Sequence, residues 1–538
     1  MRPPPDTPAR RAGAVLVALG ALALFVSVGS ISSLGLMARC GGPLLLAAGA
    51  LVYFARDTRE LAAAIARQGR QTWAREKPEL LAVIALTTIG AILRARILGD
   101  APFRYDESYS FLYFASQPVG VAVSDYHVPN NHILHSLLMH FAWRAFGDAE
   151  WVLRLPAFAA GTLLVPATYA VGRMLNGRVA AVVAAALVVP SAALVAYSAN
   201  GRGYTMMILF FLIAVALGAA VLRRPYNRAL WTLWAANAVL GFCTMPLMAL
   251  PLGVVGTWLS LSLLLGGSHG DRWRRLAPLT AASATALVVC GVLYWPLRHQ
   301  RGFDYSWIRD RDLGALVYST LDIFAAQVPV VVQALLIALA AIGLMAHRAI
   351  GRQPLPLAVG LVAIPVIVLF TGQLPPFERT WFFVLPLLAI MSGAGAAVLV
   401  RHIRGPLAAR VGLVTVLALA TALGIDPPPQ RVWATDLGYA RDADVLARYF
   451  ARPENLGVPV LVDPRSGTTW RFYMVRHDDA NHPFIDRLQP VAGVQTALIP
   501  VHDPQSTARV LAEAGVTEGM DVKRVERLAH TTIYQVTY

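Results

Sequence analysis

Long apolar runs separated by short polar stretches dominate the pattern of this chain. A helix needs about 20 predominantly apolar residues to cross the hydrocarbon core of a bilayer. On that basis the sequence predicts about thirteen spans, two of which meet at Pro246. They are Ala14–Ile31, Leu34–Phe54, Glu79–Leu98, Trp151–Met174, Val179–Tyr197, Tyr204–Leu222, Ala229–Pro246, Leu247–Leu265, Ala277–Pro296, Val328–His347, Leu355–Thr371, Trp381–Val400 and Leu407–Leu423. The pattern is that of an α-helical polytopic membrane protein.

A proline-rich break follows the last span. Asp426-Pro427-Pro428-Pro429 cannot continue a helix, because proline lacks the backbone N–H and clashes with the preceding turn. The polar stretch Asp463–Thr469 lacks the spacing and the lysine of a phosphate-binding loop and predicts a surface turn. The remaining pattern predicts a small C-terminal α/β soluble domain. Its strands are expected at Val458–Val462, Thr496–Val501 and Thr531–Tyr538, and its helices at Asp436–Phe450 and Gln505–Ala514.

These segments divide the chain into three parts. Residues 1–77 hold two leading spans and a basic linker, residues 78–424 form the membrane core, and residues 425–538 form the soluble domain. Two loops of the core, 99–150 and 297–327, are longer than a connection between spans requires. The first contains His132–Phe146, which is too short and too polar for a span and predicts a helix lying flat at the membrane surface.

Composition agrees with the membrane pattern, and the distribution of charge orients it. Hydrophobic residues make up 57% of the chain and charged residues 14%, against about 25% charged in soluble proteins. The net charge of +15 is spread over every second loop, including the Arg56–Lys77 linker. This spread argues against a nucleic-acid partner and, by the positive-inside rule, places those loops in the cytoplasm. The 99–150 loop and the C-terminal domain are then expected on the outer side.

Cysteines and paired glycines within the spans have structural explanations. Cys40, Cys243 and Cys290 fall in or beside apolar spans, which is typical of small buried side chains rather than of a disulfide framework or a metal site. Gly393 and Gly395 share one span, where glycine allows close helix packing.

Two adjacent carboxylates, Asp106 and Glu107, follow the span Glu79–Leu98. Carboxylates beside a membrane are costly unless they pair with a cation or take part in chemistry, so these two are the leading candidates for function. They belong to a series of motifs, namely Tyr105-Asp106-Glu107-Ser108, Tyr126-His127-Val128-Pro129-Asn130-Asn131-His132, Phe146-Gly147 and Arg154-Leu155-Pro156.

These motifs resemble the polytopic glycosyltransferases of the GT-C type, in the branch that contains protein O-mannosyltransferases and lipid A aminoarabinose transferases. The resemblance covers about Glu79–Val400 and implies the GT-C fold and transfer of a sugar from a polyprenyl-phosphate carrier. Members of this family usually place the acidic motif after their first span, whereas two additional spans precede it here. The resemblance therefore assigns no role to residues 1–77.

Sugar transfer from a lipid phosphate requires one base and no second acid. The proton of the acceptor hydroxyl must be removed while an oxocarbenium-like centre develops, and the phosphate leaves as a stable anion. We interpret Asp106 as this base, the role that the resemblance implies for it. For Glu107, the second catalytic candidate, three roles stay open: orienting Asp106, binding the acceptor, or helping to hold a divalent cation as in some relatives. The alternative for both acids is ion pairing with Arg104 and Arg96.

A lipid phosphate also needs cationic partners, for which arginine is well suited. Arg202 lies in the turn Asn200-Gly201-Arg202-Gly203-Tyr204 between two spans, where glycine lets the backbone approach a ligand. Arg379 has the same placement, but a local ion pair with Glu378 is its alternative. We interpret Arg154 as an anchor that reaches for the lipid headgroups. Further binding candidates adjoin these motifs: Arg104, Tyr105 and Tyr204.

The second motif supplies hydrogen-bonding side chains within one short loop. His127, Asn130, Asn131 and His132 are candidates for binding sugar or acceptor hydroxyls, and Asn131 is also placed to cap the following helix. His132 and His135 share a helical face, which leaves metal ligation open beside ordinary hydrogen bonding. The sequence requires no cofactor, and a divalent cation stays open.

The expected function is inverting glycosyl transfer from a polyprenyl-phosphate-linked donor to an envelope lipid, glycan or protein acceptor, at the outer face of the inner (plasma) membrane. The alternative enzyme is an envelope-polysaccharide polymerase or ligase that uses a pyrophosphate-linked donor. The non-enzymatic alternative is a transporter, which would need ionisable residues near mid-span and inverted repeats, and the sequence pattern offers neither.

Overall fold

The computed structural model describes the greater part of the chain. The described residues are 7–27, 33–99, 102–128, 130–266, 271–294, 330–371, 378–401, 442–477, 484–485, 488–489, 494–502, 507–529 and 531–538. The side chains of residues 25–27, 33–40, 368–371, 378, 464–465 and 484 are outside this description. The predicted span Leu407–Leu423 and the whole of the 297–327 loop lie outside the described residues.

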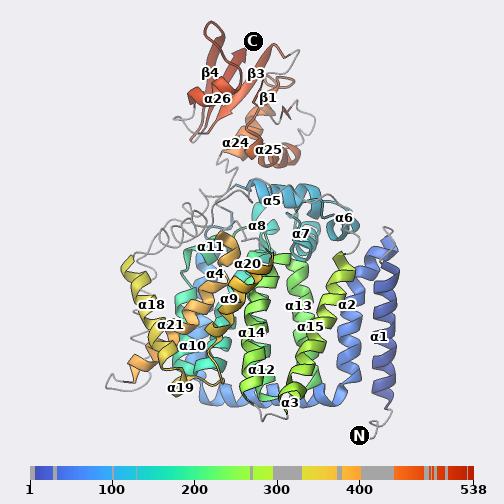
Figure 1. Ribbon diagram of the computed structural model, residues 1–538. Helices are drawn as coiled ribbons and strands as arrows, with labels where there is room; N and C mark the ends of the chain where they lie inside the picture. The colour runs from blue at the N-terminus through green and yellow to red at the C-terminus, as the bar shows by residue number, and fades with distance from the viewer. Residues whose placement is uncertain are drawn as a thin grey trace.

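A bundle of roughly parallel helices forms the body of the molecule (Figure 1). Five of the described helices are long and apolar enough to cross a membrane, or six if one bent pair counts as a single span. They are α4 (Lys77–Ala95), α9 (Leu155–Asn176), α12 (Tyr204–Arg223), α14 (Ala249–Leu265) with its leading turn η2 (Pro246–Met248), α15 (Arg272–Tyr294), and the pair α10 (Arg178–Val188) and α11 (Ala192–Ser198). The fold is that of a multi-pass membrane protein, while the predicted total of thirteen spans stays a prediction.

Other apolar helices complete the bundle. The hairpin of α1 (Pro8–Ser27) and α2 (Ser33–Tyr53) packs beside α13 (Arg228–Thr244) and α15. On the opposite side, α18 (Val330–Met345) and α10 both pack against α21 (Val384–Val400). A Cβ on Gly393 or Gly395 of α21 would collide with backbone carbonyls of Ala180 and Leu339, which confirms that these glycines serve close packing. The remaining short pieces are α19 (His347–Ile350), η4 (Leu357–Val362), α20 (Ala363–Thr371) and η5 (Glu378–Trp381).

The predicted span Val179–Tyr197 is broken into α10 and α11, which meet at an angle of 64°. Pro190 lies in this break. The helix ends there because proline cannot donate the backbone hydrogen bond that would continue it. The buried Arg94 bridges the break, because its guanidinium donates to the carbonyl of Val189 at 3.1 Å and to the hydroxyl of Ser198 at 3.1 Å. The bend directs the chain after α11 into the turn that carries Arg202.

The loop between α4 and α9 folds into short helices on one end of the bundle. These are α5 (Tyr105–Ser110), η1 (Phe111–Ala115), α6 (Val119–Ser124), α7 (Ile133–Phe146) and α8 (Glu150–Leu153). The helix α7 matches the helix predicted at His132–Phe146. At the other end of the bundle, α3 (Ala55–Arg75) runs across the ends of the spans (Figure 1).

The C-terminal segment forms a small α/β unit above α5 (Figure 1). Its five-stranded sheet has the order β2-β1-β3-β5-β4, with β1 parallel to β2 and β3, and β5 antiparallel to both β3 and β4. The elements are α24 (Ala443–Phe450), β1 (Val460–Leu461), α25 (Pro464–Arg476), β2 (Phe484–Ile485), β3 (Thr496–Val501), α26 (Thr507–Glu513), β4 (Asp521–Arg527) and β5 (Thr532–Thr537). The surface turn predicted at Asp463–Thr469 is wrong, because helix α25 begins there and buries Trp470 at its centre.

Candidate functional site

Helix α5 presents the two adjacent acids in opposite ways. Arg104 is the N-cap, and the Glu107 carboxylate accepts the Arg104 backbone N–H at 3.1 Å, as in a capping box. Glu107 is fully buried, whereas the side chain of Asp106 is 35% exposed. Two consecutive positions of one helix thus lie in different environments, Glu107 in the interior and Asp106 at an accessible surface.

Glu107 is surrounded by hydrogen-bond donors from the N-cap of its own helix and from two distant segments. Its carboxylate accepts two bonds from the Arg154 guanidinium, both at 2.9 Å, one from the Arg104 guanidinium at 3.1 Å and one from the Gly201 backbone N–H at 2.5 Å. These cations outweigh the effect of burial and keep the pKa of Glu107 below its ordinary value. The residues present do not fit a divalent cation at Glu107, because donors already occupy both oxygens and two of them carry positive charge.

Arg154 does not reach for the headgroups, so that interpretation is wrong. Its side chain is fully buried, and besides Glu107 it donates to the carbonyls of Leu98 at 2.9 Å and Pro102 at 3.1 Å. The guanidinium also lies over the ring of Phe103 at 5.2 Å. The alternative pairing of the acids with arginines therefore holds for Glu107 with Arg104, while Arg96 is exposed and forms no ion pair within the described chain.

Asp106 faces two arginines at the accessible side of the site. Its Oδ2 lies 3.2 Å from the Arg379 guanidinium and 3.9 Å from that of Arg202. Burial alone would raise the pKa of the Asp106 carboxyl, but the charges of Arg202 and Arg379 together bring that pKa below its ordinary value. An ionised carboxylate with partial access to solvent therefore sits between two cations from different segments of the chain. The alternative pair of Arg379 with Glu378 concerns a side chain outside the described set.

Arg202 is fixed by the second motif. Its Nη1 donates to the Asn130 carbonyl at 3.0 Å, to the Asn130 side-chain oxygen, and to the Ser110 hydroxyl at 3.1 Å. Its Nε is buried and has no hydrogen-bond partner among the described residues. Arg379 donates to the Tyr204 hydroxyl at 2.8 Å, and the Tyr204 ring lies under both guanidinium groups, 6.0 Å from Arg202 and 5.7 Å from Arg379. Tyr204 thus holds the two arginines side by side.

Two of the four polar candidates in the second motif contact this centre. The Asn130 amide donates to the Asp106 carbonyl at 3.1 Å. The His132 Nδ1 accepts the Gly203 backbone N–H at 2.8 Å, so the neutral ring carries its proton on Nε2. Burial, followed by the charge of Arg202, lowers the pKa of His132 well below its ordinary value. His132 is therefore a neutral support of the arginine turn.

The other two candidates lie further from Asp106. Asn131 is buried and donates to the carbonyls of Ala122 and Asp125, and it accepts from Ser136, so it ties α6 to α7 rather than capping with its side chain the first turn of α7. The His127 ring contacts Asp125 at 2.6 Å and the Tyr109 hydroxyl at 2.9 Å. Tyr105 packs at 6.2 Å from the Tyr109 ring. These groups form a polar and aromatic margin beside the centre.

The metal site that the sequence left open is not supported by a cluster of ligands among the described residues. The described residues contain no group of three or more histidine, cysteine, aspartate or glutamate side chains placed to hold a metal ion. His132 is used by Gly203, and the neighbouring His135 is buried.

The C-terminal domain reaches the acid loop, which the sequence pattern did not predict. The Tyr473 hydroxyl accepts the Phe103 backbone N–H at 2.7 Å and donates to Glu150 at 3.0 Å. The ring of Phe472 stacks on Phe103 at 4.7 Å, and Arg476 pairs with Glu150 at 2.8 Å. These contacts join positions more than 300 residues apart, and no local motif announces them.

Comparison with known proteins identifies the fold. No protein-family model matches the chain, and no curated protein matches it in sequence. The crystal structure of ArnT from Cupriavidus metallidurans in the apo state is similar, with a TM-score of 0.57 and 15% identity, covering 84% of this chain and 97% of that chain. The same protein bound to undecaprenyl phosphate gives a TM-score of 0.55 and 14% identity, covering 84% and 97%. An oligosaccharyltransferase from Archaeoglobus fulgidus, in complex with Zn and sulfate, gives 0.48 and 14%, covering 81% and 70%.

The chain therefore has the fold of the GT-C class of polytopic membrane proteins, and that prediction is confirmed. At 15% identity or less, the likeness to ArnT concerns the arrangement of the chain and leaves the chemistry to be argued from the site.

Proposed function

We propose that this protein is an inverting glycosyltransferase that uses a sugar linked to a polyprenyl phosphate. The observation that carries the proposal is the accessible, ionised Asp106 held between Arg379 and Arg202 on the GT-C fold. A carboxylate supplies the base, and the two cations supply the site for an anionic carrier. The structure of ArnT with undecaprenyl phosphate supports a polyprenyl carrier for a chain of this fold.

The proposed step moves one proton and exchanges one bond. Asp106 takes the proton of the acceptor hydroxyl while the oxygen of that hydroxyl forms a bond to the anomeric carbon of the sugar. The bond from that carbon to the phosphate oxygen breaks, and the polyprenyl phosphate leaves with the electron pair. Attack from the side opposite the leaving group inverts the anomeric centre, so no enzyme-linked sugar is formed.

The arginines couple donor binding to the strength of the base. In the free protein their charges lower the pKa of Asp106, which weakens it as a proton acceptor. A donor phosphate that binds Arg379 and Arg202 shares their charge, so the pKa of Asp106 rises toward its ordinary value. Asp106 then becomes a stronger base only when a donor is in place.

Glu107 and its neighbours act by positioning in this proposal. The Glu107 carboxylate joins the segments that carry Asp106, Arg154 and Gly201, and therefore fixes the distance between the base and the Arg202 turn. Asn130, His132 and Tyr204 orient the two arginines. His127 and Tyr105 line the route along which we expect the acceptor to approach, and the buried Asn131 holds α6 against α7 beside it.

The location follows from the charge distribution. Because the basic loops mark the cytoplasmic side, we assign the acid motif and the C-terminal domain to the outer face of the inner membrane. The acceptor is an envelope lipid, glycan or protein that meets the carrier there. The proposal includes a total of about thirteen membrane spans.

Mass spectrometry of envelope lipids and glycans tests the function. Cells that lack the gene should miss a single sugar mass on one product, and the wild-type gene should restore it. Asp106→Asn should fail to restore it although the protein accumulates in the membrane, whereas Asp148→Asn, an acid of the same loop that lies away from the two arginines, should succeed. An unchanged product with Asp106→Asn would overturn the proposal. Accumulation of a pyrophosphate-linked oligosaccharide in place of a sugar monophosphate would favour the polymerase or ligase.

A further inference from the structure

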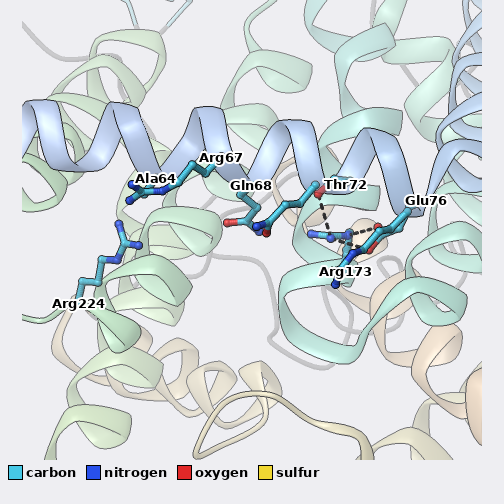
Figure 2. Close-up of a pocket in the computed structure, with 9 residues that line it drawn as sticks. Ala64, Arg67, Gln68, Thr72, Glu76, Arg173 and Arg224 are labelled. Atoms are coloured by element: carbon cyan, nitrogen blue, oxygen red, sulfur yellow. Dashed lines mark hydrogen bonds and ion pairs between the residues drawn. The ribbon is translucent and has the colours of Figure 1, made fainter.

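A cavity of about 380 Å³ lies beside α3, at the end of the bundle opposite the acid motif (Figures 1 and 2). The helix α3 contributes Arg67, Gln68, Thr72 and Arg75 to its wall, and the ends of α9 and α12 contribute Arg173 and Arg224. Figure 2 shows Arg224 and Arg173 below the two halves of α3, with the polar side chains of that helix between them. The wall is therefore polar and shared by three helices.

Positive charge in this wall is only partly neutralised. Of the charged residues that line the cavity, four are arginines and one, Glu76, is an acid. The Glu76 carboxylate is held by Arg173 at 2.6 and 2.8 Å, and this hydrogen bonding, with the nearby charges of Arg178 and Arg352, lowers the pKa of Glu76. The single carboxylate of the wall is thus already paired with Arg173.

The other three arginines of the cavity wall have no acidic partner among the described residues. Within the described part of the chain, Arg67, Arg75 and Arg224 form no ion pair with a carboxylate. These exposed arginines, grouped without counter-charges, create a positive surface potential that attracts anions. Arg173, in contrast, is held by Glu76 and by the Thr72 hydroxyl at 3.2 Å. One guanidinium of the wall is therefore ordered before any ligand binds.

We propose that this cavity binds a phosphate group, carried by an anionic phospholipid or by a soluble compound. Guanidinium groups match the geometry of phosphate oxygens, and the amides of Gln68 and Gln71 add donors. Basic pockets at the cytoplasmic ends of membrane helices bind lipid headgroups in this manner. The helix α3 also exposes Ile65 and Trp73, side chains suited to an interfacial position. A bound phosphate joins the linker helix to α9 and α12.

Binding to the full-length purified protein in detergent tests this site without reference to sugar transfer. The probes are dioleoyl-phosphatidylglycerol, with dioleoyl-phosphatidylcholine as the neutral comparison, and inorganic phosphate. The cavity variant is Arg67→Gln with Arg224→Gln, and the matched control is Arg59→Gln with Arg70→Gln, which removes two exposed charges of α3 outside the cavity. Native mass spectrometry and the shift of the thermal midpoint with probe concentration report the affinity.

The cavity variant should bind its probe at least about tenfold more weakly than the wild type, since two charge-assisted hydrogen-bonding groups are lost, and the control should bind as the wild type does. Selective loss of phosphatidylglycerol binding identifies a lipid headgroup, and loss of phosphate binding alone identifies a soluble anion. Should the double variant not fold, Arg224→Gln replaces it, because that side chain is exposed. Equal affinity of the wild type and the cavity variant for both probes, or no binding of either probe by the wild type, would overturn the proposal.

Discussion

The Tyr473 hydroxyl, in the C-terminal domain, accepts the backbone N–H of Phe103 at 2.7 Å, three residues before Asp106. The contact spans 370 positions of the sequence and fixes the entrance of the acid motif from above. It lies in an apolar seam in which Phe472 packs between the rings of Phe103 and Phe111. The C-terminal domain thus shapes the site, although none of its described residues contributes a group to the Asp106 centre.

Replacing Tyr473 with Phe should therefore slow the proposed transfer. The substitution keeps the ring and removes the acceptor for a buried N–H, which costs about 1–3 kcal/mol. Tyr538→Phe is the control, because it removes a hydrogen bond from the Tyr538 hydroxyl to the Ala514 carbonyl, at the end of α26 in the same domain and away from the acid loop. We expect both variants to lower the thermal midpoint and only Tyr473→Phe to lower kcat. A kcat equal to the wild-type value would show that the seam holds the domain without positioning the acids.

Glu107→Gln should lower the stability of the folded protein, and not only its activity. It removes the negative charge that Glu107 presents to the buried Arg104 and Arg154, and breaking a buried ion pair costs about 3–5 kcal/mol. The exposed acid Glu60, paired with Arg56 on α3, gives the control Glu60→Gln, for which we expect little effect. The yield of monodisperse protein and its thermal midpoint measure the difference.

The same carboxylate makes stability depend on pH. Because the pKa of folded Glu107 is below its ordinary value of 4.5, its contribution is complete above pH 4.5 and is lost as the pH falls through the folded pKa. The wild-type midpoint should decline over that acidic range, and Glu107→Gln should lack this part of the decline. A decline of equal size in both proteins would assign the acid sensitivity to other groups.

Arg379→Gln should shift the pH profile of transfer. The charge of Arg379 helps to lower the pKa of Asp106, so its removal raises that pKa and moves the acidic limb of kcat/KM to higher pH. The variant should also raise KM for the donor, because one phosphate partner is lost. Arg96→Gln, at an exposed arginine away from the site, should leave both unchanged. An acidic limb that stays in place after Arg379→Gln would separate Asp106 from the rate-limiting proton transfer.

Gly203→Ala should damage the turn that holds Arg202. A Cβ at this position would lie 2.7 Å from the Thr244 methyl group and 3.2 Å from the His132 Nδ1, which accepts the Gly203 N–H. Overpacking of this kind costs about 1–3 kcal/mol. Gly256→Ala in α14 is the control, since a Cβ there meets no atom within 4 Å. We expect loss of transfer with Gly203→Ala at a thermal midpoint that still reports a folded protein, and wild-type transfer with Gly256→Ala.

The sequence was sufficient to predict the class of fold and the segments that form the centre. Apolar runs predicted the helical membrane body, the position of Asp106 beyond a span end singled out the acidic motif, and the hydrogen-bonding side chains around Asn130 singled out the second motif, which the structure joins to the first. The different roles of Asp106 and Glu107 could not be predicted from the sequence. Glu107 differs from Asp106 because Arg154 and Gly201, 47 and 94 positions away, occupy its carboxylate, and nothing in the local pattern encodes that contact.

The same limit explains the errors. Arg154 opens a span as an anchoring residue would, and only the fold shows that it points inward to a carboxylate. The break between α10 and α11 escaped a test based on average hydropathy, because Pro190 changes the direction of the helix without reducing its apolar character. The polar start of α25 was interpreted as a turn, although Trp470 and Tyr473 further along carry the buried face of a helix.

The shared carboxylate of Glu107 has a consequence for biosynthesis. A membrane chain emerges from the ribosome in order, so residue 107 is present long before its partners at 154 and 201, and before Arg379 and Tyr473. Until Arg154, which directly precedes the next span, has been synthesised, the Glu107 carboxylate has no described counter-charge from outside its own helix. Under the proposed function, the Asp106 centre is complete only after Arg379 has been synthesised, and the contact of Tyr473 with Phe103 is the last of these contacts to form.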